Sequence, residues 1–337
     1  MHALSVWLEF AVALLLITVA GSRLARSGDV IARRTGLGGT WIGLVLVATV
    51  TSLPELITGV SAVVLADAPD IAVGTLLGSC VFNLVIIVIL DFLVPGRSFY
   101  SRVRQDHVLS ASFGIILVGT VGFSILLVGQ GWGVALGHVG LYTPIIFGMY
   151  LMAMRAVYHH EKDNHVAAAE GQPARDAHTS LRAASVQYAL AGLVVVATGI
   201  WLPFVGERIA VVMNVHETFV GSLFIALATS LPEVVVTIVA LRIGAFDLAM
   251  SNLLGSNLFN IAVLVPVDLL YTEAPILSAV SPLHTISAVS AIMMTAIAMV
   301  GLIYRPRRLL FRRLAWSSLM LLSLYLFNFY VLYLYGS

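Results

Sequence analysis

The sequence predicts an all-α polytopic membrane protein whose ten transmembrane helices form two inverted five-helix repeats, with broken helices near the middle of the membrane. Three observations predict this fold. Hydrophobic residues make up 60% of the 337 residues and charged residues only 10%, whereas soluble domains carry about 25% charged residues. The chain contains a series of long apolar stretches, and one pentapeptide, Thr-Ser-Leu-Pro-Glu, occurs twice inside them.

Each apolar stretch is long enough to cross about 30 Å of hydrocarbon. The most polar stretch of the chain separates the fifth from the sixth, and its composition is typical of a flexible linker. We therefore expect a first repeat over 1–155, a cytoplasmic linker over 156–184 and a second repeat over 185–337. The ten predicted spans are 3–22, 36–65, 71–94, 107–129, 134–154, 185–204, 215–240, 247–270, 283–304 and 314–335.

The two halves repeat each other in sequence. The repeat runs without gaps through the first helix pair and loses one residue in the next loop. The matching pairs include Gly21 with Gly199, Thr40 with Thr218, the pentapeptide at Thr51–Glu55 with that at Thr229–Glu233, Gly78-Ser79 with Gly255-Ser256, and Asn83 with Asn260. Because five helices per half is an odd number, the second half enters the membrane upside down, and the repeats are inverted.

The basic residues predict the orientation, because cytoplasmic loops carry an excess of Lys and Arg. With the N-terminus outside, Arg208 is the only one of the 18 Lys and Arg residues that does not fall on the cytoplasmic side. The expectation is an integral protein of a prokaryotic plasma (inner) membrane, with both termini outside. The first apolar stretch lacks a basic start and a cleavage site, so it is expected to span the membrane.

The repeated pentapeptide places an acid and a proline inside the second and the seventh predicted span. A carboxylate deep in a bilayer is costly, so Glu55 and Glu233 indicate function rather than packing. Pro54 and Pro232 each remove a helix hydrogen bond, and the freed carbonyl groups must face protein, water or an ion. Two such breaks in matching halves predict a substrate site between the halves, near the midplane.

The polar residues that accompany the two acids offer almost only oxygen donors. Thr51 and Ser52 stand beside Glu55, and Ser79 and Asn83 lie four residues apart on the next span, on one helix face. Carboxylate, hydroxyl and amide oxygens suit hard cations such as Ca²⁺, Na⁺ or Mg²⁺, and they disfavour zinc or copper. The second half repeats the set with Thr229, Ser230, Glu233, Ser256 and Asn260.

The paired Thr-Ser-Leu-Pro-Glu and Gly-Ser-x-x-x-Asn motifs resemble the two alpha-repeats of the sodium/calcium exchanger family, in its prokaryotic form, within the calcium:cation antiporter superfamily. The resemblance covers both halves. It implies exchange of Ca²⁺ for Na⁺ by alternating access, in which the first and sixth helices slide past the remaining bundle. It also implies the ion ligands Thr51, Ser52, Glu55, Ser79, Asn83, Thr229, Ser230, Glu233, Ser256 and Asn260, joined by the backbone carbonyls of Ala48 and Ala226.

Four positions depart from the family pattern. Val50 and Ala228 stand where the family usually has Gly before Thr-Ser, and Cys80 replaces the usual Asn after the first Gly-Ser. Some prokaryotic relatives carry Asp at the position of Asn260, so this chain has only two intramembrane carboxylates in its motifs. Two negative charges balance one Ca²⁺, two Na⁺ or two H⁺, whereas three Na⁺ would leave an excess positive charge in a low-dielectric site.

Other function classes remain as alternatives at this stage. A cation/proton antiporter on the same fold is the nearest, and a non-transporting membrane scaffold or sensor is a different class. An enzyme is not expected, because the chain has no His-Glu-x-x-His, Gly-x-Ser-x-Gly or phosphate-loop motif. We expect no cofactor; the transported ions are Ca²⁺ and Na⁺, with H⁺ as a further possibility. Partners are inorganic cations and membrane lipid, without nucleic acid or an obligate protein partner.

Three further acids are expected to play supporting roles. Asp91 and Asp268 follow the repeated asparagines at the same distance, and each is expected at the end of a helix near the membrane surface. Glu9 lies in the first span near its outer end, where snorkelling toward the interface is favoured over ion binding.

Overall fold

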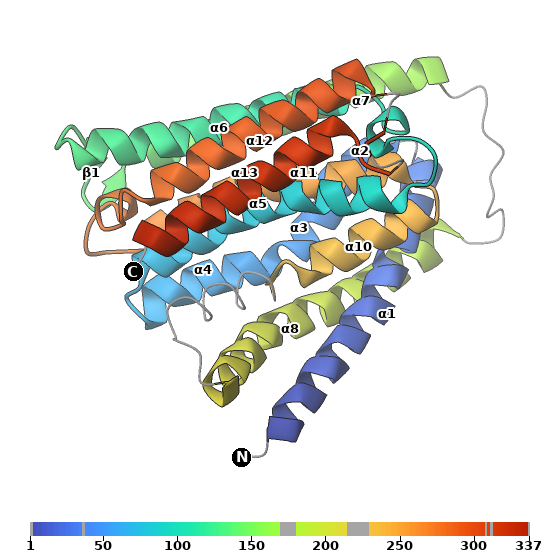
Figure 1. Cartoon of the computed structure of the whole chain (residues 1–337). Coiled ribbons are helices and arrows are strands. Elements are labelled where there is room, and N and C mark those ends of the chain that lie inside the picture. Colours follow the sequence, from blue (N-terminus) through green and yellow to red (C-terminus); the bar gives the residue numbers. More distant parts are fainter. Residues whose placement is uncertain are drawn as a thin grey trace. The chain divides into compact units, whose positions relative to one another are not determined.

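The computed structural model describes residues 3–35, 38–168, 180–213, 229–306, 309–310 and 313–335, which are mostly helical (Figure 1). Seven described helices are long and apolar enough to span a membrane, and the broken pair Ile42–Thr51 and Leu53–Leu65 makes an eighth if it is counted as one span. The chain divides into two compact units. Unit 1 comprises Met1–Pro54 and Met154–Ser256, and unit 2 comprises Glu55–Ala153 and Asn257–Ser337. Each unit therefore combines residues from both sequence repeats.

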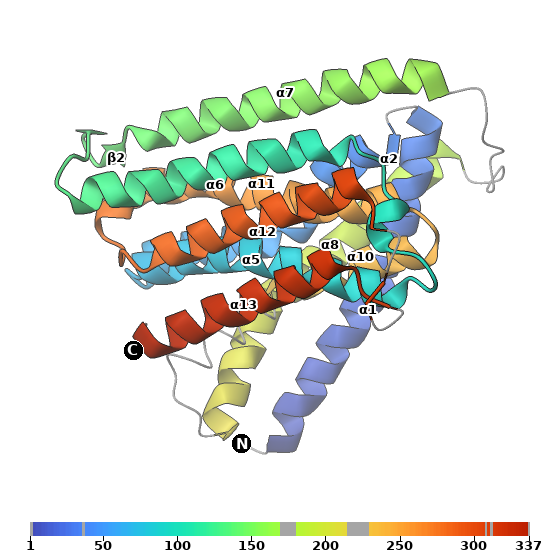
Figure 2. The ribbon, with the colours of Figure 1, turned by 45° about the horizontal axis from the view of Figure 1, so that its top comes forward.

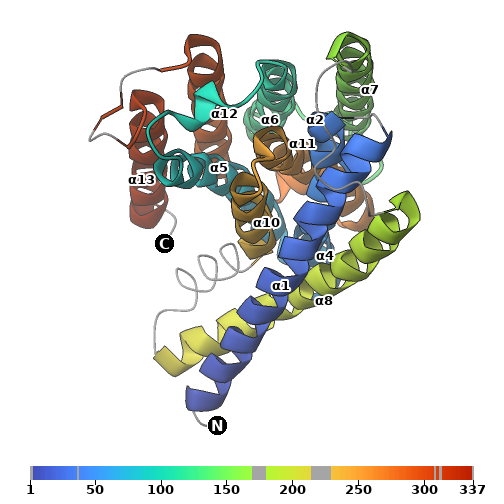
Figure 3. The same cartoon turned by 90° about the vertical axis from the view of Figure 1, so that its right-hand side faces the viewer.

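Unit 1 is built around two long helices, α1 (Ala3–Thr35) and α8 (Leu181–Met213), which pack side by side and both contact α10 (Leu231–Arg242) (Figure 3). Ala13 and Ile17 of α1 are fully buried against Trp201, Leu231 and Val235. The unit also contains α2 (Gly38–Trp41), the π-helix η1 (Ile42–Val47), α3 (Ala48–Thr51), α10, the end of α7 (Tyr142–Ala168) and the part of α11 (Phe246–Leu270) that precedes Asn257.

Unit 2 is a helical bundle in which α12 (His284–Tyr304) packs against α5 (Pro69–Leu93), α6 (His107–Gly129) and α13 (Trp316–Tyr335) (Figure 2). The same unit contains α4 (Leu53–Leu65) from Glu55 onward, the 3₁₀ helices η2 (Phe99–Ser101) and η3 (Ile276–Ser278), the strands β1 (Ala135–Leu136) and β2 (Val139–Gly140), α7 (Tyr142–Ala168) as far as Ala153, and α11 (Phe246–Leu270) from Asn257.

The helix boundaries repeat as the sequence does. The equivalent helices α1 and α8 both have 33 residues, and α5 and α11 both have 25. A 3₁₀ helix follows each member of the second pair. This agreement supports the predicted repeat. Most predicted spans match closely, and the predicted 107–129 is α6 itself.

Several boundaries differ from the sequence prediction, among them the end of α8, which lies at Met213 rather than at residue 204. Helix α1 continues past residue 22 to Thr35, because its charged residues lie on one exposed side while Leu24 and Ala25 are buried. The predicted span 134–154 begins with the β1–β2 hairpin, and its helix starts only at Tyr142. Helix α7 continues to Ala168 and α8 begins at Leu181, so the described ends of the predicted linker are helical. The predicted span 215–240 begins among residues that the structure does not describe.

Large apolar side chains remain exposed along several helices. Leu15 of α1 is 63% exposed and Leu193 of α8 is 68% exposed, and Phe327 of α13 is exposed as well. A soluble protein rarely exposes so much contiguous apolar surface, whereas a helix that faces lipid does so throughout. The exposed faces therefore agree with a membrane location.

Two fully buried aspartates hold unit 2 together near the ends of α5 and α11. Asp91 accepts hydrogen bonds from the backbone N–H groups of Phe99 (2.7 Å) and Ala315 (2.6 Å) and from the Ser98 and Ser318 hydroxyls. The donors at Phe99 and Ala315 lie at the starts of η2 and α13, where helix dipoles stabilise a negative charge. The expected helix-end position is thus confirmed, but Asp91 is buried.

Asp268 repeats this arrangement in the other half of the sequence. It accepts hydrogen bonds from the backbone N–H of Ile276 (2.7 Å) at the start of η3 and from that of Gly140 (3.0 Å). The hydroxyls of Tyr142 and Thr143, at the start of α7, complete its four donors. In each repeat, the third helix therefore carries a buried aspartate near its end. This aspartate accepts hydrogen bonds from the first residues of the fifth helix of the other repeat.

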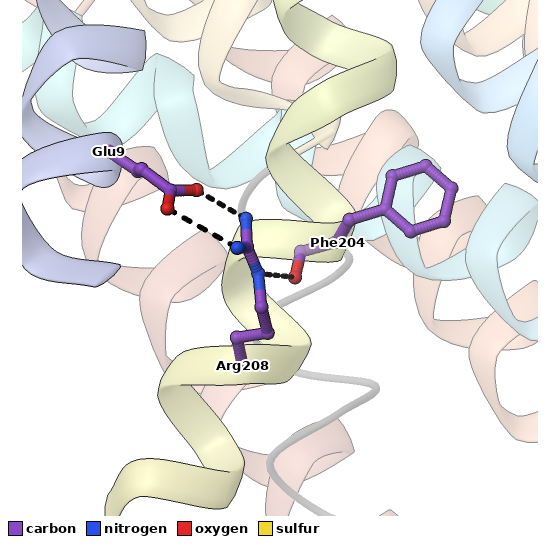
Figure 4. Close-up of polar contacts among 3 residues, drawn as sticks. All are labelled: Glu9, Phe204 and Arg208. Atoms are coloured by element: carbon purple, nitrogen blue, oxygen red, sulfur yellow. Dashed lines mark hydrogen bonds and ion pairs between the residues drawn. The ribbon is translucent and has the colours of Figure 1, made fainter. Parts of the chain in front are cut away.

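Glu9 of α1 forms a two-pronged ion pair with Arg208 of α8, as Figure 4 shows. Nη1 of Arg208 lies 3.3 Å from Oε1 of Glu9, Nη2 contacts Oε2, and Nε donates to the Phe204 carbonyl at 3.3 Å. Arg208 is the one Lys or Arg residue that the predicted topology places on the outer side of the membrane. Its charge is therefore paired within unit 1, between the two longest helices.

We expect this ion pair to stabilise unit 1 measurably. A double-mutant cycle of Glu9→Gln and Arg208→Gln should give a coupling energy of about 1 kcal/mol, because bidentate charge-assisted bonds are stronger than single contacts between exposed groups. Thermal unfolding of the purified protein measures it. The Asp29–Arg33 pair, a single contact of 2.9 Å between residues four apart on α1, serves as the control and should give about 0.3–0.5 kcal/mol. Equal couplings for the two pairs would contradict this expectation.

Candidate functional site

In both pentapeptides a helix begins directly after the serine. Ser52 separates α3 from α4 with φ −96° and ψ 7°, and Ser230 precedes α10 with φ −86° and ψ 1°. In each case the proline follows two residues later and cannot donate a backbone hydrogen bond. Ser52 therefore breaks the helix of the first repeat, as the sequence predicts, whereas the residues before Thr229 lie outside the described part of the chain.

The π-helix η1, which α3 separates from the break at Ser52, packs very closely against α11. A Cβ on Gly255 would lie 2.5 Å from the Leu44 carbonyl oxygen, and one on Gly43 would lie 2.0 Å from Oγ of Ser251. Such distances exclude any side chain at either glycine. Short π-helical turns are rare and occur frequently at functional sites. The two glycines therefore bring the backbones of η1 and α11 together beside the polar residues of unit 1.

Glu233 is the buried acid of unit 1. Its side chain is 1% exposed, and its Oε1 accepts a hydrogen bond of 2.9 Å from the Ser52 hydroxyl. The Ser256 hydroxyl lies 3.5 Å from the same oxygen. Among the residues that the structure describes, none donates a hydrogen bond to Oε2 of Glu233. A buried carboxylate oxygen in this state is suited to bind a cation or a proton.

Thr51 lies beside this acid in unit 1 and is fully buried. Its hydroxyl lies 3.2 Å from the Ala48 carbonyl oxygen and 3.4 Å from Oδ1 of Asn252. The Ala48 carbonyl also accepts the backbone N–H of Ser52 at 2.9 Å. The carbonyl proposed as a ligand from the family pattern is therefore hydrogen-bonded here, and it would share its oxygen with these donors.

Unit 2 holds a second group of buried polar residues. Nδ2 of Asn83 donates to Oδ1 of Asn257 at 3.0 Å, and Nδ2 of Asn257 donates to the Cys80 carbonyl at 3.1 Å. The carboxamide oxygens of Asn83 and Asn260 are buried and accept no hydrogen bond within the described part of the chain. Glu55 and Ser79, in the same unit, are at most 1% exposed.

The predicted site residues thus fall into two groups, one in each unit. Eleven of the twelve positions are described by the structure, and their side chains are buried. Ala226 lies outside the described residues. The unit 1 group contains Ala48, Thr51, Ser52, Thr229, Ser230, Glu233 and Ser256, and the unit 2 group contains Glu55, Ser79, Asn83 and Asn260.

The departures from the family pattern have local explanations where the structure describes them. Val50 packs against Gly192 of α8, where an added Cβ would lie 3.2 Å from the Val50 side chain. The small residue on α8 therefore accommodates the larger residue on the first broken span. The Cys80 thiol contacts the Asn257 carbonyl at 3.7 Å, so Cys80 and Asn257 bond reciprocally. Ala228 lies outside the described residues.

Two polar residues of unit 1 were missed by the sequence analysis. Asn252 and Thr237 are fully buried, and Nδ2 of Asn252 donates to the Thr237 hydroxyl at 3.0 Å. Each lies four residues from a predicted ligand on its own helix, Asn252 from Ser256 and Thr237 from Glu233. That spacing places residues on one helix face, and it is the signal that could have identified them.

The two groups offer oxygen atoms but few other metal ligands. No cluster of three His, Cys, Asp or Glu residues occurs in the part of the chain that the structure describes. The donors are carboxylates, hydroxyls, carboxamides and backbone carbonyls. Such a set suits Ca²⁺, which takes about 6–8 oxygen ligands, or Na⁺, and it is a poor match for zinc or copper.

Comparison with known proteins agrees with this chemistry. The chain is 28% identical over 270 residues to the inner membrane protein YrbG of Escherichia coli, covering 79% of each chain. It is 28% identical over 251 residues to the putative antiporter CaxA of Alkalimonas amylolytica, covering 74% of this chain and 76% of CaxA. Over 60 residues, 17% of each chain, it is 43% identical to the sodium/calcium exchanger MaX1 of Methanosarcina acetivorans.

The fold matches a solved exchanger structure along nearly the whole chain. The sodium–calcium exchanger NCX_Mj, soaked with 2.5 mM Na⁺ and 10 mM Sr²⁺, superposes with a TM-score of 0.74 at 18% identity, covering 97% of this chain and 98% of that one. The family model described as sodium/calcium exchanger protein matches residues 5–151 and 183–335, which correspond to the two repeats. The chain belongs to the sodium/calcium exchanger family.

Proposed function

We propose that this chain exchanges Ca²⁺ for Na⁺ across a membrane by alternating access, and that buried oxygens of its repeated motifs bind the two cations in turn. The observation that carries the proposal is the environment of Glu233. Two serine hydroxyls lie close to this buried carboxylate, and none of the ion pairs in the described part of the chain joins it to a Lys or an Arg. The proposed ligands are Ala48, Thr51, Ser52, Glu55, Ser79, Asn83, Ala226, Thr229, Ser230, Glu233, Ser256 and Asn260.

The unit 2 residues support the same proposal. The buried carboxamide oxygens of Asn83 and Asn260 accept no hydrogen bond from described residues, and leaving a buried polar atom unsatisfied is costly. A cation would compensate them. Glu55 would add a second carboxylate, so the two acids would neutralise one Ca²⁺ or two Na⁺. Three Na⁺ would exceed that charge.

The same charge balance would couple the two ion fluxes. A buried carboxylate without a cation lacks solvation, so the change between inward-facing and outward-facing states would be unfavourable in the empty protein. Occupancy by either Ca²⁺ or Na⁺ would remove that cost. The hydroxyl and amide oxygens would replace the hydration shell that each cation loses on entering the site.

We place the protein in a prokaryotic plasma membrane with both termini outside and residues 156–184 in the cytoplasm. The distribution of Lys and Arg supports this orientation, and a relative is named as an inner membrane protein. Accessibility of single cysteines introduced into a Cys80→Ser background, probed in intact cells, would test it.

Reconstitution of the purified protein into liposomes tests the proposed function. An outward Na⁺ gradient should drive Ca²⁺ accumulation, and collapsing that gradient should stop it. A pH gradient without Na⁺ should not replace it. Uptake that follows the pH gradient alone would favour the cation/proton antiporter, and absence of both would contradict antiport of Ca²⁺ and leave the scaffold or sensor class.

A further inference from the structure

A second polar pair lies one helical turn from Glu233 in unit 1. Helices α10 and α11 follow each other through a short turn, so they run antiparallel, and Glu233 of α10 faces Ser256 of α11. Four residues along each helix, Thr237 faces Asn252, with Nδ2 of Asn252 donating to the Thr237 hydroxyl at 3.0 Å. This second pair is fully buried.

The Asn252 carboxamide presents its oxygen to Thr51. The Thr51 hydroxyl, which also lies beside the Glu233 carboxylate, can give its single proton to the Ala48 carbonyl at 3.2 Å or to Oδ1 of Asn252 at 3.4 Å. Two acceptors that share one donor make longer bonds of this kind. With Nδ2 of Asn252 donating to the Thr237 hydroxyl, Oδ1 is the carboxamide atom that faces Thr51.

This orientation matters for a threonine that binds a cation. A hydroxyl that donates its proton away keeps its oxygen lone pairs for the metal. If the carboxamide were reversed, Nδ2 would donate to Thr51 and occupy one of those lone pairs. If the Ala48 carbonyl turned toward the cation, Oδ1 of Asn252 would still accept the Thr51 proton, and both oxygens could then bind the same ion.

We propose that Asn252, oriented by Thr237, is a positioning residue that keeps the Thr51 hydroxyl oxygen available to the transported cation. This inference rests on the proposed exchange function and deepens it. The arrangement belongs to one repeat alone, because the equivalent positions in the first repeat are Gly59 and Thr75. Gly59 has no side chain to orient a partner, and a Cβ there would lie 3.4 Å from Val267.

Two variants at this pair test the proposal. Thr237→Val keeps the side-chain shape but removes the hydroxyl that orients Asn252, and Asn252→Leu removes the oxygen that accepts the Thr51 proton. Each should raise the apparent KM for Ca²⁺ about 3–10-fold, the effect of one hydrogen bond, and leave the maximal rate of Na⁺-driven uptake within about 2-fold of wild type.

The matched control is Thr75→Val, which removes the equivalent hydroxyl of the first repeat and should leave KM unchanged. An unchanged KM in Thr237→Val and Asn252→Leu would overturn the proposal, as would a lower maximal rate with the wild-type KM. The Ca²⁺-dependent rise in melting temperature of the detergent-solubilised protein gives a second readout that needs no transport. If wild-type liposomes show no Na⁺-driven uptake, the proposed exchange function is wrong. A Ca²⁺-dependent rise in melting temperature that is smaller in Thr237→Val and Asn252→Leu than in wild type would still support the role of Asn252 in Ca²⁺ binding.

Discussion

Replacing Glu233 by glutamine is expected to reduce Na⁺-driven Ca²⁺ uptake by about 100-fold or more. The substitution keeps the size of the side chain but removes the charge from a site that is 1% exposed. Uncompensated charge in a buried position costs about 3–5 kcal/mol, which corresponds to two or more factors of ten. The new amide would also place N–H donors where the structure has a carboxylate that accepts from Ser52.

Uptake of Ca²⁺ into liposomes under an outward Na⁺ gradient measures this effect. Glu273→Gln is the control, because Glu273 is an exposed acid in the segment that follows α11, and it should transport like wild type. Glu55→Gln should repeat the loss, since the proposal assigns one carboxylate to each unit. Uptake by Glu233→Gln within about 3-fold of wild type, at equal reconstituted protein, would remove Glu233 from the mechanism.

Replacing Asp268 by asparagine is expected to lower the melting temperature by about 5–10 °C. The carboxylate is fully buried and accepts four hydrogen bonds, so its loss leaves a buried amide group among donors and costs about 3–5 kcal/mol. For a chain of this size, 1 kcal/mol corresponds to about 2 °C. Asp91→Asn should behave in the same way, because its four donors are arranged equivalently.

Thermal unfolding of the detergent-solubilised protein checks the second prediction. Asp70→Asn is the matched control: Asp70 begins α5, and it accepts from Ser281 N–H (2.7 Å) and contacts His284 (2.9 Å), but its side chain is 55% exposed. Water can satisfy the groups that this change frees, so the shift should stay below about 2 °C. Similar shifts for Asp70→Asn and Asp268→Asn would show that burial does not decide the effect.

The sequence predicted most of the helices because their signals are local. A run of apolar residues long enough to span a membrane is recognisable without knowing its neighbours. The prediction was less accurate where helices carry charge. Helix α1 continues to Thr35 and α7 to Ala168, beyond their apolar parts, because helices can extend past the bilayer when polar residues lie on their exposed sides.

The site could be predicted in part for the same reason. An acid and a proline inside an apolar segment are unusual whatever surrounds them, so Glu55 and Glu233 could be identified directly. Asn252 and Thr237 carry no such anomaly, since a single buried amide or hydroxyl is common in membrane helices. Their contact with each other and with Thr51 joins segments that are far apart in the chain.

By itself, the sequence determined the membrane-spanning helices, the internal repeat and the two buried acids, because hydrophobicity, proline and charge act on the residues that carry them. The tertiary structure alone decided that Arg208 pairs with Glu9, that four donors surround each of Asp91 and Asp268, and that Asn252 presents an oxygen to Thr51. Hydrogen bonds depend on distance and direction in space, and only folding brings residues so distant in the chain within their range.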